Sequence, residues 1–135
     1  MKLNALAVLA LLATTTPLAA ESESPAPQSL TLLFAPNSTA IRPSDTPLLD
    51  AAARLYRDGH PIILVLTGGT DAVGSPELNL RLSQARTVAV LHGLVARGIP
   101  AGRFQLVAKG ASEPAVPAAV GVAEERNRRV EIRWR

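Results

Sequence analysis

The alternation of hydrophobic and polar positions along the chain predicts four β-strands. Residues 29–34 (SLTLLF) form a short apolar run that ends in the turn residues Ala35-Pro36-Asn37-Ser38. Residues 62–66 (IILVL) form a continuous run rich in β-branched side chains, which favours a central strand buried on both faces. A third strand is predicted at Phe104–Ala108 (FQLVA). Residues 130–134 alternate apolar and charged side chains, as a half-buried fourth strand does.

Two stretches repeat apolar residues at the spacing of an α-helix. The first begins after Ser44 or Asp45, either of which can cap it, and it ends at Gly59. Its apolar positions are Leu48, Leu49, Ala52 and either Leu55 or Tyr56. The second covers residues 76–97 and ends at Gly98. Its predicted core-facing stripe is Leu78, Leu82, Ala85, Ala89 and Ala96, with His92 on the same stripe as a core histidine.

The order of these elements is strand, helix, strand, helix, strand, strand. This order predicts an α/β fold of the two-layer sandwich type, with two helices on one face of a four-stranded mixed sheet. The alternating pattern of the last strand indicates that the other face of the sheet is exposed to water.

Residues 1–20 have the pattern of a secretory signal peptide. Lys2 gives a positive start, an apolar run follows, and Leu18-Ala19-Ala20 resembles a cleavage site. The apolar run is about half of the ~20 residues that a membrane-spanning helix needs, so a permanent anchor is the weaker alternative. Residues 21–28 (ESESPAPQ) predict a flexible tail, and residues 29–135 a single domain. The leader therefore predicts export out of the cytoplasm.

The composition argues against several classes of function. The 135-residue chain has no cysteine, which excludes disulfides, thiolate metal sites and the cysteine anchor of a lipoprotein. Two histidines leave little for a metal site, and aromatic residues at 3% are too few to stack nucleic-acid bases. The net charge of +3 comes from arginines interspersed with acids. We therefore expect no metal, no cofactor and no nucleic-acid partner.

The stretch from Thr67 to Arg86 (TGGTDAVGSPELNLRLSQAR) carries the candidate chemistry. Asp71 lies in a glycine-rich turn after a strand, and the following helix presents Asn79, Ser83 and Arg86 on one face. An acid facing an arginine predicts a small charged cleft that suits a zwitterionic ligand. The alternative is that Asp71 and Arg86 form an internal salt bridge that orders the turn, contributing only ~0–1 kcal/mol if exposed.

Several motifs occur in the order and at the spacing of a known family. They are Thr70-Asp71-Ala72-Val73-Gly74, Asn79 with Leu82-Ser83 and Arg86, and Asn127-Arg128-Arg129-Val130-Glu131. Together they resemble the OmpA-like C-terminal, peptidoglycan-binding domain family, as found in outer-membrane protein A, Pal and MotB. The chain departs from the family pattern at Gly69, where histidine is usual, and at Thr87, where alanine is usual.

The resemblance implies a ligand, the diaminopimelate of peptidoglycan, which carries an ammonium and a carboxylate on one carbon at its free end. Asp71 suits the ammonium, and the planar guanidinium of Arg86 suits the carboxylate. The peptidoglycan-binding residues that the resemblance implies are Asp71, Arg86, Asn79, Thr70, Arg128 and Arg129.

The predicted function is non-catalytic binding of peptidoglycan in the periplasm, linking the wall to the outer membrane or to an envelope protein. The alternative is an OmpA-like fold used only as a protein-interaction module. A wall-degrading enzyme is disfavoured, since no nucleophile–base pair or pair of acids is visible around Asp71. Homodimerisation is left open.

Overall fold

The computed structural model describes residues 29–59 and 63–135. The predicted leader (1–20) and tail (21–28) lie outside these ranges. The strands are β1 (Ser29–Leu33), β2 (Leu64–Gly69), β3 (Phe104–Ala108) and β4 (Arg129–Trp134), and the α-helices are α1 (Thr46–Gly59) and α2 (Pro76–Val95). Single turns of 3-10 helix cover Pro43–Asp45, Ala101–Arg103 and Glu125–Asn127. The predicted order of elements is confirmed, although β2 runs three residues beyond the predicted end at residue 66.

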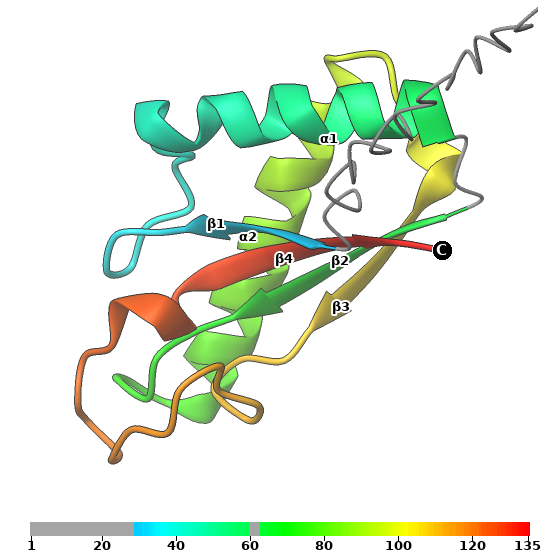
Figure 1. Cartoon of the computed structure of the whole chain (residues 1–135). Helices are drawn as coiled ribbons and strands as arrows, with labels where there is room; N and C mark the ends of the chain where they lie inside the picture. The colour runs from blue at the N-terminus through cyan, green and yellow to red at the C-terminus, as the bar shows by residue number, and fades with distance from the viewer. Residues whose placement is uncertain (1–28, 60–62) are drawn as a thin grey trace, which may run out of the picture.

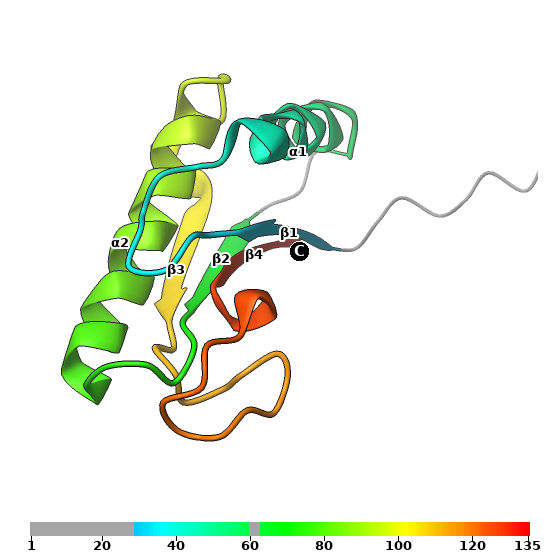
Figure 2. The ribbon, with the colours of Figure 1, turned by 90° about the vertical axis from the view of Figure 1, so that its left-hand side faces the viewer.

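The four strands form one mixed sheet in the order β1-β4-β2-β3. β4 pairs antiparallel with both β1 and β2, whereas β2 pairs parallel with β3. Both helices lie on the same face of this sheet, as the two perpendicular views show (Figures 1 and 2). The predicted two-layer α/β architecture is therefore confirmed. No helix in the described part of the chain is long and apolar enough to cross a membrane.

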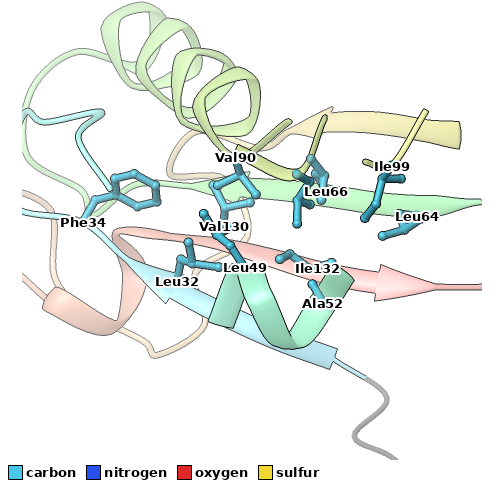
Figure 3. Close-up of a cluster of buried hydrophobic side chains, with 11 residues drawn as sticks. Leu32, Phe34, Leu49, Ala52, Leu64, Leu66, Val90, Ile99, Val130 and Ile132 are labelled. Atoms are coloured by element: carbon cyan, nitrogen blue, oxygen red, sulfur yellow. The ribbon is translucent and has the colours of Figure 1, made fainter. Parts of the chain in front are cut away.

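The hydrophobic core lies between the sheet and the two helices (Figure 3). β2 and β4 contribute its centre, where Leu66 and Ile132 are fully buried. Helix α1 adds Leu49 and Ala52, two of its predicted apolar positions. Phe34 occupies one end of this core, directly after β1. The core thus fixes the ends of β1, β2 and β4, from which the loops of the candidate site start.

Helix α2 packs on the sheet with a different face from the one predicted. The buried residues of α2 are Asn79, Ser83, Arg86, Thr87, Val90 and Leu94. Of the predicted stripe, Leu78, Ala85, His92 and Ala96 are exposed, and Leu82 and Ala89 are half-buried. The prediction of a core histidine at position 92 is wrong. The physical reason is that buried polar side chains in the first half of α2 form hydrogen bonds inside the fold. The orientation of this half is therefore not set by the burial of apolar side chains.

Helix α2 packs closely against the sheet at Gly68. A β-carbon at this position would overlap the main-chain oxygen of Ser83 and the methyl group of Thr87. Because main chain cannot yield as a flexible side chain does, we expect Gly68→Ala to lower the free energy of unfolding by about 1–3 kcal/mol. The measurement is urea unfolding followed by circular dichroism.

The control is Gly102→Ala, because no described atom lies within 4 Å of a β-carbon added there. Its expected change is within about 0.5 kcal/mol. Equal effects of the two substitutions would contradict the close approach of α2 to β2.

Candidate functional site

Three loops meet at one end of the sheet: the one after β1, the one after β2, and the one that precedes β4 (Figures 1 and 2). They enclose, with about the first three turns of α2, a cleft of about 310 Å³. Its lining residues are Pro36, Asn37, Asp71, Val73, Gly74, Leu78, Asn79, Leu82, Arg86 and Ala123. The structure therefore brings three of the predicted site residues, Asp71, Asn79 and Arg86, into one cleft.

Arg86 is fully buried and bonds only to main-chain oxygens. Its Nε donates to Ser38 O at 2.9 Å, Nη1 to Gly69 O at 3.1 Å, and Nη2 to Ala35 O at 3.2 Å. The guanidinium carbon lies 5.2 Å from the centre of the Phe34 ring, within cation–π range. Arg86 thus joins the loop after β1 to the end of β2, and two of its five N–H groups are left over for the cleft.

Burial lowers the pKa of the Arg86 guanidinium from its ordinary value to about 10. The negative charge of Asp71 opposes this shift, whereas the positive charge of Arg128 adds to it. The group is still a cation at neutral pH. No carboxylate of the described residues forms a salt bridge with it, so its charge lacks an ionic partner inside the fold.

Asp71 forms its salt bridge with Arg128, at 2.9 Å, and not with Arg86. The proposed internal Asp71–Arg86 pair is therefore wrong. Both side chains of the actual pair are only 10% exposed, and Arg128 Nε also donates to Phe34 O at 2.9 Å. Oδ2 of Asp71 accepts hydrogen bonds from Arg128 Nη1 at 2.9 Å and from Glu124 N at 3.3 Å. Oδ1 accepts none from the described chain, and Asp71 lines the cleft.

Thr70 and Asn79 are buried polar residues with unused bonding capacity. Thr70 Oγ1 is buried and has no hydrogen-bond partner, although Thr70 N donates to Gly110 O at 2.8 Å. Asn79 is 5% exposed, and its side-chain amide forms no hydrogen bond within the described ranges. A buried group left unpaired, such as Thr70 Oγ1, costs free energy, typically ~1–3 kcal/mol. Asn79 lines the cleft, where a ligand can bond to it, whereas Thr70 does not line it.

The two C-terminal arginines that sequence reasoning could not separate have different places. Neither of them lines the cleft. Arg128 bonds to Asp71, which does line it, whereas Arg129 Nη2 donates to Glu113 O at 3.0 Å. Arg129 is paired in register with Gly69, and a β-carbon at Gly69 would overlap its Nη1. The guanidinium of Arg129 therefore occupies the space that a side chain at position 69 would enter.

The sequence did not single out Pro36, Asn37 and Ala123, which complete the walls of the cleft. Asn37 has a left-handed backbone with φ 52°, which asparagine tolerates better than most residues. The Pro-Asn pair after the first strand is a turn signal in the sequence. Nothing in that signal indicated that the pair would line the same cleft as Arg86. No group of three or more histidines, cysteines or acids that could hold a metal occurs in residues 29–59 and 63–135.

A sequence profile of the OmpA family matches residues 33–128. The chain belongs to the OmpA family. It is 30% identical over 116 residues to outer membrane protein A of Bordetella avium, covering 82% of this chain and 60% of that protein. It is 37% identical over 87 residues to the peptidoglycan-associated lipoprotein of Pasteurella multocida, covering 64% and 58%. The OmpA-family chain thus spans about 60% of the length of these curated relatives.

The fold agrees with this assignment. The crystal structure of the peptidoglycan-associated lipoprotein from Burkholderia pseudomallei superimposes with a TM-score of 0.72. The match covers 78% of this chain and 89% of the other at 24% sequence identity. The family resemblance drawn from the TDxxG turn, the motif on α2 and the arginine pair before β4 is therefore confirmed, together with the fold that it implied.

Proposed function

We propose that this OmpA-family domain binds peptidoglycan without catalysis, by capturing the zwitterionic end of diaminopimelate in the cleft between Asp71 and Arg86. The proposal rests on the charge and the hydrogen bonding of these two side chains. Arg86 is a buried cation that bonds only to carbonyl oxygens, and Asp71 has an oxygen with no partner, both on one cleft.

The local charge favours a ligand with a carboxylate. Asp71 and Arg128 compensate each other, which leaves the charge of Arg86 in excess. A ligand carboxylate placed against the two remaining N–H groups of Arg86 supplies the missing anion. The ammonium on the same carbon then meets Oδ1 of Asp71. A ligand with only one of the two groups leaves a buried charge or a lone oxygen unpaired, and we expect it to bind weakly.

The N-terminus of α2 supports the same orientation. Ser75 caps the helix by accepting a hydrogen bond from Leu78 N at 3.2 Å, and Leu78 lines the cleft. The first turn of a helix carries partial positive charge, which favours a carboxylate nearby. We assign Asn79 as a hydrogen-bonding residue beside the ligand, Thr70 as a buried hydroxyl behind Asp71, and Arg128 as the residue that holds Asp71 in place.

The relatives support this function at a coarser level. Two of them are named peptidoglycan-associated lipoproteins, in Pasteurella multocida and Burkholderia pseudomallei. We infer that the present protein likewise associates with peptidoglycan, in the periplasm after export by its N-terminal leader. Outer-membrane or other envelope proteins are the partners that such an anchor would join to the wall.

The decisive experiment changes the ligand and leaves the protein unaltered. Purified protein is sedimented with sacculi that contain diaminopimelate, and separately with sacculi that contain lysine at the same position. Lysine has the side-chain ammonium but lacks the carboxylate that Arg86 requires. We expect co-sedimentation with the diaminopimelate wall only, and its progressive loss when free meso-diaminopimelate is added.

Free cadaverine at the same concentration is the matched competitor, because it has the ammonium groups but no carboxylate, and it should leave the bound fraction unchanged. Equal binding to both kinds of sacculi would overturn the assignment of the ligand. Binding to neither wall would overturn the function and favour the alternative, an OmpA-like domain used for protein interaction.

A further inference from the structure

A second cavity of about 540 Å³ adjoins the cleft on the other side of Asn79. It lies between the first turns of α2 and the segment that follows β3, two parts of the chain that run side by side in both views (Figures 1 and 2). Gly74 and Asn79 line both hollows, so the two are neighbours with a shared wall. The remaining walls are mostly apolar, with Leu80 and Val120 among them.

The cavity is built by hydrogen bonds and does not depend on a ligand to form. Gly110 N donates to Ser83 Oγ at 2.9 Å, and Gly110 O accepts from Thr70 N at 2.8 Å. Farther along the loop, Gly121 N donates to Ala72 O at 2.8 Å. Gly110 has φ 53°, and a β-carbon there would crowd the main chain of Leu80. The loop is thus held against α2 at the distance that leaves this hollow.

Asn79 is the feature that indicates a ligand. Its side chain is among the buried polar groups, at 5% exposure, and it lines both hollows without a hydrogen bond from the described chain. A primary amide offers donors and an acceptor together, the same pair of functions that a peptide bond requires. A peptide group crossing from the cleft to the second cavity would satisfy it.

The rim of the second cavity carries one cation. Lys109 Nζ pairs with Glu113 Oε1 at 3.1 Å, and the carboxylate of Glu113 is 66% exposed. An exposed pair of this kind contributes only about 0–1 kcal/mol, so the ammonium can readily bond another carboxylate. The apolar wall beside it is open to a ligand, since Leu80 is 45% and Val120 91% exposed.

We propose that the second cavity is a subsite for the small apolar amino acid that is amide-linked to the diaminopimelate, an alanine with a free carboxylate. In this arrangement Asn79 bonds the connecting peptide group, Leu80 and Val120 contact the methyl group, and Lys109 pairs with the terminal carboxylate. The subsite rests on the proposed function, because the diaminopimelate in the cleft brings the peptide group to Asn79.

The test compares two soluble stem peptides by isothermal titration calorimetry. One ends in diaminopimelate and the other carries one further D-alanine. For the unaltered protein we expect the longer peptide to bind about tenfold more tightly, a difference of ~1.4 kcal/mol. In Leu80→Asp a carboxylate replaces the apolar wall, so this advantage should disappear while the affinity for the shorter peptide is unchanged. Leu80 is suitable because it does not line the first cleft.

Val88→Asp is the matched control. Val88 is an exposed apolar residue on the same helix, at 38% exposure, and it lines neither hollow. Both peptides should bind this variant as they bind the unaltered protein. A second variant, Lys109→Met, should bind the longer peptide more weakly than the unaltered protein does. This difference should disappear when the longer peptide is amidated at its C-terminus, because the amide has no carboxylate for Lys109.

The outcomes separate the two proposals. Equal affinity of the unaltered protein for the two peptides would overturn the subsite and leave the cleft intact. Equal weakening of both peptides by Leu80→Asp would also overturn it, by showing that the substitution acts on the first cleft. Binding of neither peptide would overturn the proposed function itself.

Discussion

Replacement of Arg86 by alanine is expected to lower the free energy of unfolding by about 3–5 kcal/mol, the range for loss of a large, fully buried and hydrogen-bonded side chain. The substitution leaves the carbonyls of Ala35, Ser38 and Gly69 without their donors and opens a hole beside Phe34. Each buried acceptor left unpaired costs roughly 1–3 kcal/mol, and removal of a desolvated charge offsets part of this.

The measurement is urea unfolding of the variant and of the unaltered protein. For a domain of this size the same loss corresponds to a fall in Tm of roughly 12–30 °C. Arg81→Ala is the control, because Arg81 is an exposed arginine of the same helix. Its change should stay within about 0.5 kcal/mol. A loss below about 1 kcal/mol for Arg86→Ala would show that its hydrogen bonds contribute little, against the range expected for such a residue.

Asp71→Asn is expected to weaken binding to diaminopimelate sacculi by at least about 100-fold, equivalent to ~2.7 kcal/mol. The asparagine has nearly the same shape but no negative charge for the ligand ammonium. It also leaves the side chain of Arg128, which is 10% exposed, as a buried cation with no anion. Breaking such a pair from one side is strongly destabilising, by about 3–5 kcal/mol. Lost binding in this variant alone therefore has two explanations.

A double variant separates these two explanations. Arg128→Met added to Asp71→Asn removes the unpaired cation, so much of the stability should return while binding stays lost. Asp50→Asn is the control for the charge change, since Asp50 forms an exposed pair with Arg97 at 2.7 Å and lies on α1. Sacculus co-sedimentation gives the affinity, and urea unfolding gives the stability. A stable double variant that binds like the unaltered protein would exclude Asp71 as the ammonium partner.

The fold was largely predictable, because the signals for its elements are local. A continuous apolar run predicted β2, alternation predicted β4, and Phe104–Ala108 was predicted with the observed bounds. Gly59 marked the end of α1, whereas the predicted caps Ser44 and Asp45 lie in a 3-10 turn before it. The orientation of α2 was not predictable in this way, since apolar periodicity favoured the stripe through Leu78 and Ala85. Which face is buried depends on Ala35, Ser38 and Gly69 as acceptors for Arg86, and these contacts exist only after folding.

The same limit applies to the candidate site. The shared helix face of Asn79, Ser83 and Arg86 was predictable from spacing, and the structure buries all three. The salt-bridge partner of Asp71 was not predictable, because Arg128 is distant from Asp71 in the sequence. The neighbouring Arg129 also has the same guanidinium group. The two arginines have different backbone positions, since Arg128 ends the 3-10 turn Glu125–Asn127 and Arg129 is the first residue of β4. The overlap between Gly69 and Arg129 likewise depends on the strand register.

The position of β4 in the sheet has a consequence for the order in which the protein can fold. Residue 29 pairs with residue 133, and residue 64 with residue 134. Neither β1 nor β2 can therefore form its pairing with β4 before this C-terminal strand is present. Until that segment has been synthesised, only the parallel β2–β3 pair and the helices can form. Closing such long loops is slow and confers cooperativity on the final step. During synthesis the growing chain therefore lacks a completed sheet, and its native structure forms only once β4 is available.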